Sequence, residues 1–236
     1  MHTLLIRLLK IQVGRDMELE QARFNMIEQQ IRPWDVLDQR VLDLLASVPR
    51  EDFVPEAYRR LAYADIAIPL DEGEVMMHPK LEARMLQAVD LHPTDVVLEI
   101  GTGSGYVTAL LATMTRHVYS VEIHPALSET AAARLAARGL ENVTLEVGDA
   151  SRGWDGGDRR YDVIVITGSL PQLPASFQNK LNRGGRLFAV VGEAPVMEAV
   201  LVRREGPHAH DFSREALFET EVPPLRNAPR PRRFVF

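Results

Sequence analysis

The chain has 236 residues, of which 46% are hydrophobic and 25% are charged, and its formal net charge is -6. This composition is typical of a globular protein and excludes a wholly disordered chain. The negative charge gives no electrostatic footprint for nucleic acid, so no nucleic-acid partner is expected. The sequence contains no cysteine, which excludes disulfides, cysteine-ligated metals and a thiol nucleophile. We predict no metal site and expect a reducing, cytoplasmic location.

The first ten residues, MHTLLIRLLK, are apolar and basic. Arg7 interrupts the apolar run and no small-residue cleavage site follows, so we interpret 1–16 as an extension ahead of Met17 rather than a signal peptide. No apolar run is long enough to span a bilayer, and no membrane partner is expected.

Residues 17–92 are predicted to form a helical segment or lid. The first helix has apolar residues at helical spacing and should end at Pro33; its buried positions are Phe24, Ile27 and Ile31. Asp38 can cap a second helix, which stops before Pro49. A third helix carries Pro79 in its first turn, and its buried stripe is Leu81, Met85, Leu86 and Val89.

From residue 94 onward, short apolar runs alternate with helical runs. The predicted strands cover 96–101, 118–123, 143–148, 161–167 and 185–192, and the predicted helices cover 105–115, 125–138 and 172–182. Segments 197–205 and 214–222 lack a helix between them, which predicts an antiparallel pair at one sheet edge. We therefore predict an α/β fold: a doubly wound, mostly parallel, Rossmann-like sheet of about seven strands.

This α/β domain is expected to cover 93–220, and 221–236 to form a basic, proline-rich tail. The tail arginines are interpreted as solvated, with binding to an acidic partner as the alternative; they are Arg226, Arg230, Arg232 and Arg233.

A glycine-rich turn follows the first strand of this domain, with glycines at 101, 103 and 105. Glycines permit positive φ and close approach of a ligand, and the following helix offers free N–H groups. In an open sheet, ligands bind in this crevice. The spacing is G-x-G-x-G with Tyr106 in the sixth position, whereas a dinucleotide-binding turn reads G-x-G-x-x-G.

Three acidic residues lie near successive strand ends. Glu99 precedes the first glycine by two positions, where it would repel a pyrophosphate and favour a cationic ligand. Glu122 can accept hydrogen bonds from both ribose hydroxyls, a role that suits either S-adenosylmethionine (AdoMet) or NAD. Asp149 can reach an adenine amino group. Together these residues favour AdoMet, which carries a sulfonium and an ammonium group but no phosphate, and they disfavour an NAD-dependent oxidoreductase.

Two sets of motifs carry a family resemblance. One set resembles the AdoMet-binding motifs of class I methyltransferases: VLEIGTGSGY, VYSVE, NVTLEVGDASRGW and YDVIVITGS. The other resembles the protein-L-isoaspartate O-methyltransferase family: MIEQQI, VLDLLASVPREDFVP, AYADIAIPL and GEVMMHPKLEARML. The resemblance spans about residues 20 to 205.

The resemblance implies a class I methyltransferase fold and methyl transfer from AdoMet to the carboxylate of L-isoaspartyl residues in damaged proteins, with S-adenosyl-L-homocysteine as product. The expected cofactor-binding residues are Val75, Met76, Met77, Glu99, Gly101, Thr102, Gly103, Ser104, Gly105, Glu122, Ile123, Asp149 and Ala150.

One motif departs from the family. Where the family has T-I-S-x-P, this chain has Val75-Met76-Met77-His78-Pro79, so Met77 replaces a serine and Val75 replaces a threonine. Two hydroxyls beside the reacting carboxylate are lost, and Thr167 and Ser169 are candidates to replace them. The candidate catalytic residues are Met77, His78 and Thr167. His78 is either a base or donor to the acceptor, or an exposed residue before a helix.

The missing serine leaves alternatives open. A carboxylate acceptor has a pKa of about 4 and needs no general base at neutral pH, whereas an alcohol or amine acceptor would. A paralogue could methylate another peptide or a small molecule, and a protein that binds AdoMet without turnover is a further alternative. The expected partner is a peptide or protein carboxylate or a small-molecule acceptor, and the expected state is a monomer or homodimer.

Overall fold

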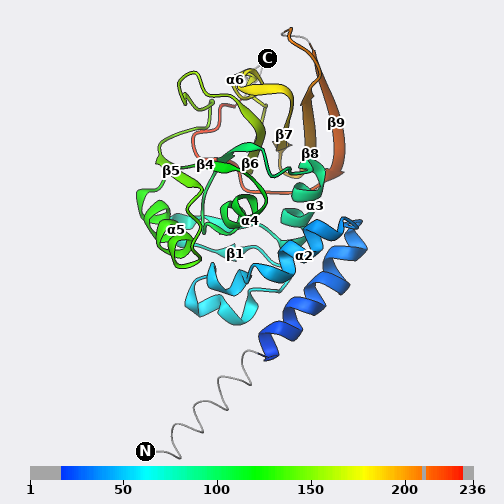
Figure 1. The fold of residues 1–236 in the computed structure, drawn as a ribbon, viewed down its shortest axis with the longest axis vertical. Helices are drawn as coiled ribbons and strands as arrows, with labels where there is room; N and C mark the ends of the chain where they lie inside the picture. The colour runs from blue at the N-terminus through cyan, green and yellow to red at the C-terminus, as the bar shows by residue number, and fades with distance from the viewer. Residues whose placement is uncertain (1–16, 209–210, 231–236) are drawn as a thin grey trace, which may run out of the picture.

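A central β-sheet organises the computed structural model, which describes residues 17–208 and 211–230. Within these ranges the main sheet has seven strands in the order β5-β4-β3-β6-β7-β8-β9 (Figure 1). Their bounds are β3 Val96–Ile100, β4 His117–Glu122, β5 Val143–Val147, β6 Tyr161–Leu170, β7 Leu181–Glu193, β8 Val196–Arg204 and β9 Phe212–Glu219. The extension 1–16 and the arginines at 232 and 233 lie outside the described residues.

The predicted mostly parallel α/β sheet is confirmed. Strands β5, β4, β3, β6 and β7 pair in parallel, and β8 and β9 form the predicted antiparallel edge. The chain runs outward from β3 through β4 to β5 and then returns to β6 beside β3. This reversal creates a crevice at the carboxyl ends of β3 and β6, the place where open α/β sheets bind ligands.

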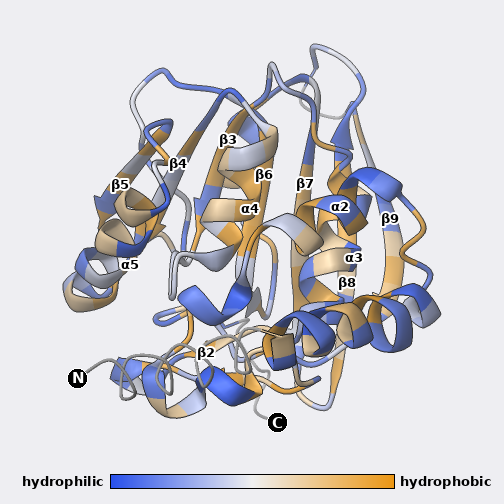
Figure 2. Cartoon of the chain, turned by 60° about the horizontal axis from the view of Figure 1, so that its bottom comes forward, coloured by the Kyte–Doolittle hydropathy of each residue, from blue (hydrophilic) through white to orange (hydrophobic). Residues whose placement is uncertain are grey.

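Helices cover both faces of the sheet. Helices α3 (Pro79–Val89) and α4 (Tyr106–Met114) pack on the face that includes Val97, together with α2 (Gln39–Ser47). Helix α6 (Ala175–Asn179) contributes Phe177 to the buried cluster on the opposite face, which includes Leu98. Successive side chains of β3 point to opposite faces, so both must be apolar. Helix α5 (Pro125–Ala137) connects β4 and β5, and Figure 2 shows α2, α3, α4 and α5 in front of the sheet.

Helix α6 is shorter than the predicted 172–182. Pro174 is its N-cap, and Leu181 already pairs with Tyr161 as the first residue of β7. A proline at the start and a sheet contact at the end therefore leave room for little more than one turn.

The N-terminal helices follow the sequence prediction with one exception. The Asp38 side chain accepts a hydrogen bond from Arg40 N and caps α2 as predicted. The four stripe residues of α3 are all buried. Phe24, however, is 58% exposed, because residues 17–26 form a helix that buries Met26, about half a turn away. Ile27 and Ile31 are buried in the following turn, η1 (Ile27–Ile31).

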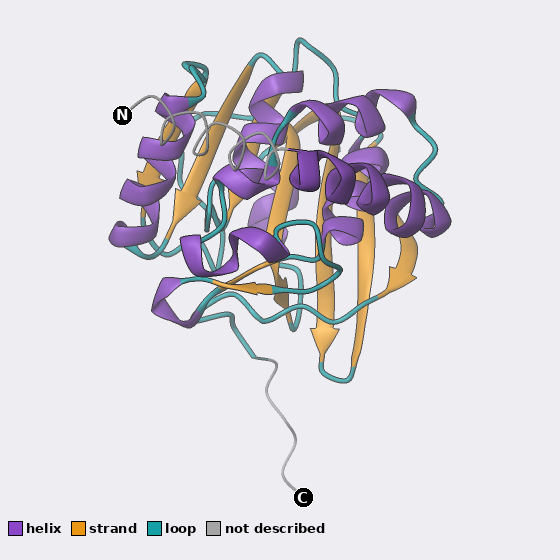
Figure 3. Cartoon of the chain, turned by 90° about the horizontal axis from the view of Figure 1, so that it is seen from below, coloured by secondary structure: helices purple, strands orange, loops and turns teal. Residues whose placement is uncertain are grey.

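A small two-stranded sheet lies at the carboxyl end of the main sheet (Figure 3). Its antiparallel strands are β1 (Ile68–Pro69) and β2 (Val75–Met76). The connection between them includes residues 71–74, so this small sheet brings the divergent motif at 75–79 to the mouth of the crevice.

Candidate active site

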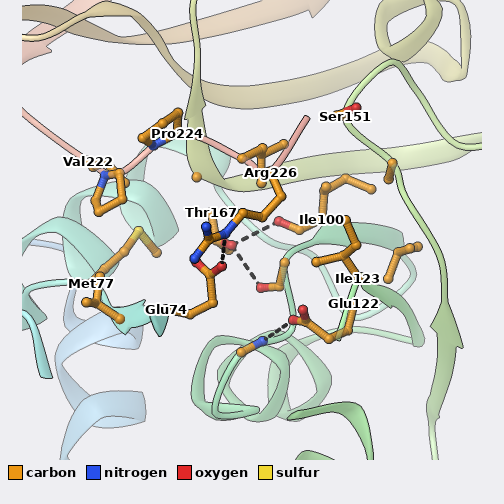
Figure 4. Close-up of a pocket in the computed structure, with 18 of the residues that line it drawn as sticks. Glu74, Met77, Ile100, Glu122, Ile123, Ser151, Thr167, Val222, Pro224 and Arg226 are labelled. Atoms are coloured by element: carbon orange, nitrogen blue, oxygen red, sulfur yellow. Dashed lines mark hydrogen bonds and ion pairs between the residues drawn. The ribbon is translucent and has the colours of Figure 1, made fainter. Parts of the chain in front are cut away.

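A pocket at the carboxyl ends of the parallel strands brings together most of the predicted site residues (Figure 4). The predicted residues that line it are Val75, Met77, His78, Gly101, Gly103, Glu122, Ile123, Asp149, Ala150 and Thr167. The cofactor motifs and the divergent motif thus share one cavity.

Five predicted cofactor-binding residues do not line this pocket: Met76, Glu99, Thr102, Ser104 and Gly105. Each is buried behind the lining rather than in it. Thr102 Oγ1 lies 2.6 Å from Ser120 Oγ, and Ser104 Oγ accepts a hydrogen bond from Tyr106 N. Gly105 begins α4 with a φ of 84°, and a Cβ there would lie 3.1 Å from Ala131 Cβ. These positions shape the turn from behind.

The glycine turn needs its glycines for two reasons. Gly101 has a φ of 93° and Gly103 a φ of 53°, a region that other residues adopt at a cost. A Cβ on Gly101 would also lie 2.3 Å from Thr167 Oγ1. The backbone of β3 therefore passes close to the end of β6, and the pocket floor is bare main chain.

The Thr167 hydroxyl is hydrogen-bonded to the backbone where β3 and β6 approach each other. Its Oγ1 lies 2.9 Å from Ile100 O and 2.8 Å from Gly101 O, both acceptors. The Ser169 hydroxyl is buried and donates to Val222 O at 2.7 Å. Both hydroxyls donate to backbone carbonyls here, so neither offers a free proton, and their replacement of the lost serine and threonine stays a prediction.

Glu122 lies at the end of β4 and its carboxylate organises the turn. Its Oε2 accepts a hydrogen bond from Gly103 N at 2.8 Å, and its Oε1 accepts one from His124 N at 3.0 Å. The residue is 4% exposed. Each carboxylate oxygen can accept a second hydrogen bond, so two hydroxyls on one ligand can still be bound.

Asp149 follows β5 and remains ionised. Its Oδ1 accepts from Ser151 N at 2.9 Å, and its Oδ2 accepts from the Asn227 side-chain amide at 2.9 Å. The Ser151 N–H is the main reason that the pKa of Asp149 lies below its ordinary value.

Glu99 behaves differently from the other two acidic residues. It is fully buried, and its Oε2 accepts from Thr108 Oγ1 at 2.6 Å and from Ser120 Oγ at 2.7 Å. Burial raises its pKa to about 8, and its Oε1 has no hydrogen-bond partner among the described residues. Glu99 is therefore mainly protonated at neutral pH and presents no negative charge to the pocket.

The divergent motif at 75–79 is anchored by a buried ion pair that the sequence did not predict. Arg50 is 0% exposed; it pairs with buried Glu82 and donates to Met77 O at 2.7 Å. Its guanidinium also lies 4.9 Å from the centre of the Tyr106 ring. The position of Met77 in the pocket wall is thus fixed from behind.

His78 lines the pocket but already has a partner. Its Nδ1 lies 3.0 Å from Asp65 Oδ1, and Lys80 Nζ lies 2.7 Å from Asp65 Oδ2. Asp65 therefore holds both the His78 ring and the Lys80 ammonium group at this side of the pocket.

Residues 221–228 form a segment that we call the C-terminal strap, and its residues 221–226 line the pocket. Ser169 N donates to Pro223 O and Leu225 N donates to Ser169 O, both at 2.9 Å. Arg226 Nε donates to Glu74 Oε1 at 2.5 Å. The strap was expected to be part of a solvated tail, and its apolar VPPL run was the one signal that it packs on the domain.

In the part of the chain that the structure describes, no three His, Asp or Glu side chains are grouped so that they could hold a metal ion. No described helix has the length and hydropathy needed to cross a bilayer.

Comparison with known families decides the relationship. A model of the protein-L-isoaspartate(D-aspartate) O-methyltransferase family matches residues 21–218. The chain belongs to this family. The resemblance seen in the sequence motifs is therefore confirmed.

Individual relatives agree with this assignment. The protein-L-isoaspartate O-methyltransferase of Protochlamydia amoebophila (strain UWE25) is 42% identical over 201 residues, covering 85% of this chain and 94% of the relative. The relative of that name from Rhodopseudomonas palustris (strain ATCC BAA-98 / CGA009) is 41% identical and covers 86% of this chain and 92% of its own length.

Solved structures agree with the fold. A Plasmodium falciparum structure, assigned as a protein-L-isoaspartate O-methyltransferase and solved with S-adenosyl-L-homocysteine, has a TM-score of 0.73 at 16% identity and covers 88% of this chain and 98% of its own. Another protein-L-isoaspartate O-methyltransferase has a TM-score of 0.71 at 26% identity and covers 86% of this chain and 65% of its own.

Proposed function

We propose that this member of the protein-L-isoaspartate O-methyltransferase family transfers a methyl group from AdoMet to the carboxylate of L-isoaspartyl residues in peptides and proteins. The observation that carries the proposal is a single cavity in which the glycine turn, Glu122 and Asp149 face the motif at 75–79. The names of its relatives and the S-adenosyl-L-homocysteine bound to the Plasmodium falciparum structure support the same activity.

The residues present suit AdoMet better than a dinucleotide. The turn offers bare backbone at Gly101 and Gly103, and ionised Asp149 and the Glu122 side chain offer hydrogen-bond acceptors. A phosphate at the turn would meet these acidic side chains. Glu122 would hold the ribose hydroxyls, while Asp149 and Ala150 would lie beside the adenine.

When bound, AdoMet supplies a methyl group on a positively charged sulfur, with a neutral thioether as leaving group. The acceptor carboxylate has an ordinary pKa of about 4, so it is ionised at neutral pH and the protein needs no general base. The apolar lining residues Val75, Met77 and Leu81 exclude water from this side of the pocket. Fixing the acceptor in line with the methyl group can lower the barrier by several kcal/mol, up to roughly 7–11 in the best models.

The direct test is methylation of two peptides that differ only in one residue, L-isoaspartate in one and L-aspartate in the other. The proposal predicts a base-labile methyl ester on the isoaspartyl peptide alone. If the protein binds AdoMet but esterifies neither peptide, the proposed substrate is wrong.

Met77 favours a second candidate, a methyltransferase of the same fold with another peptide or small-molecule acceptor. Methylation of a component of a cell extract, with none of the isoaspartyl peptide, would support this candidate. Binding of AdoMet with no methylation of either would instead indicate a protein without turnover. A cytoplasmic location and a monomeric or homodimeric state remain part of the proposal.

A further inference from the structure

The strap residue Arg226 lies at the boundary of two cavities. Arg226 lines the pocket described above, and it also lines a second, open groove beside it, whose wall includes Pro171, Pro224 and Arg230. Glu74 lines both cavities as well. A peptide lying in the groove would therefore pass Arg226 before one of its side groups entered the pocket.

An acceptor carboxylate that enters the pocket needs a hydrogen-bond donor there. The pocket already contains acidic side chains at Glu74, Glu122 and Asp149, and these disfavour another negative charge. An ionised group is stable in such a place only when it is paired or hydrogen-bonded.

The other candidate donors in this wall are used or absent. Val75 and Met77 have no hydroxyl, and the Thr167 hydroxyl is committed to backbone carbonyls. The Nδ1 atom of His78 is already engaged by Asp65 Oδ1 at 3.0 Å. Arg226 remains.

Arg226 is held in a way that lets it change partners. Its Nε donates to Glu74 Oε1 and its Nη2 donates to Glu72 O at 3.1 Å, while Nη1 makes no hydrogen bond to a described residue. The Arg226 side chain is 50% exposed, so solvent screens this ion pair and it contributes little to stability. His124 Nε2 lies 3.2 Å from the same Glu74 oxygen and can keep it paired.

We propose that Arg226 binds the acceptor carboxylate in place of the missing serine; this inference rests on the proposed function. One carboxylate oxygen accepts a hydrogen bond from the Arg226 guanidinium. Arg226 then releases Glu74, which stays paired with His124. The other oxygen forms the new O–C bond to the methyl group as the S–C bond breaks, and the electron pair of that bond stays on the neutral thioether. No proton moves.

The test compares three variants of the full chain: R226Q, E74Q and the control R214Q on the exposed face of β9. The readouts are the Kd of an isoaspartyl peptide for protein saturated with S-adenosyl-L-homocysteine, and KM and kcat for methyl ester formation. R226Q should raise the peptide Kd and KM about tenfold or more, because a charge-assisted hydrogen bond is lost. R214Q should change neither.

The E74Q variant distinguishes a role of Arg226 in substrate binding from a purely structural role in holding the strap. If Arg226 binds the carboxylate, E74Q removes its competitor and leaves the peptide Kd unchanged or lower. If the ion pair only closes the strap, E74Q and R226Q break the same contact and weaken peptide binding equally. R226K keeps the charge and should recover part of the affinity, and thermal melting confirms that each variant is folded.

Two results would overturn the inference while the proposed function stands: an unchanged peptide Kd in R226Q, or equal losses in R226Q and E74Q. A wild-type protein that binds S-adenosyl-L-homocysteine but forms no ester on the peptide would contradict the proposed function and this inference with it.

Discussion

The two sides of the pocket are assembled in different ways. The proposed cofactor side comes from strand ends and turns within about fifty residues, from Gly101 to Ala150. The proposed acceptor side joins three segments that are far apart in the sequence: Arg50, the motif at 75–79 and the C-terminal strap. Most of the first side lies on neighbouring strand ends, whereas the second side depends on contacts between distant segments, so the acceptor side can change while the cofactor side stays the same.

The largest effect on stability is expected from breaking the buried ion pair that anchors the acceptor side. Arg50→Met leaves the buried Glu82 carboxylate without its partner and removes the donor to Met77 O. Breaking a buried ion pair in this way should lower the free energy of unfolding by about 3–5 kcal/mol in urea denaturation. Arg59→Met is the matched control, because its pair with Asp52 is exposed and should be worth less than about 1 kcal/mol. Equal losses in the two variants would contradict the anchoring role.

The second prediction concerns the cofactor side and pH. Glu99 titrates near pH 8 in the folded protein and near its ordinary value of 4.5 when unfolded. Its contribution to stability is therefore complete below about pH 4.5 and is lost as the pH rises toward 8. Between pH 5 and pH 8 the wild type should lose roughly 2–4 kcal/mol more stability than Glu99→Gln, which cannot ionise. Parallel pH profiles of the two proteins in urea denaturation would show that Glu99 is not protonated.

The third prediction tests the role of Glu122 on the same side. Glu122→Ala should raise the Kd for S-adenosyl-L-homocysteine about 100-fold in calorimetry, because two hydrogen bonds to a carboxylate are lost. Glu129→Ala, on the exposed surface of α5, should leave the Kd unchanged. An unchanged Kd in the Glu122 variant would remove it from the ribose site, whereas loss of folding together with binding would give it a structural role only.

The smallest effect is expected from restoring the lost hydroxyl. Met77→Ser should raise kcat/KM for an isoaspartyl peptide about tenfold, the value of one added hydrogen bond to a charged group. Met76→Ser is the control, because Met76 is 4% exposed and does not line the pocket. A Met77 variant that is no more active than wild type would indicate that the acceptor side has adapted to another donor or another substrate.

The sequence predicted what local patterns determine. Apolar runs, helix caps and the glycine turn located the parallel strands, α3 and the positions of Glu122 and Asp149. It could not predict the strap, because the contacts of Ser169 with residues 222–225 join segments more than fifty residues apart. It also misjudged Glu99, because the alternation along β3 gives its position but not the depth of burial that raises its pKa. Arg50 shows the same limit, since an arginine is rarely buried without a partner that only the fold supplies.

The most direct test of the central claim is a crystal structure of the chain with S-adenosyl-L-homocysteine. The account predicts that the ribose hydroxyls lie on Glu122, that the adenine lies beside Asp149 and Ala150, and that the sulfur faces Met77 and His78. A nucleoside bound elsewhere, or a phosphate held at the glycine turn in its place, would contradict it.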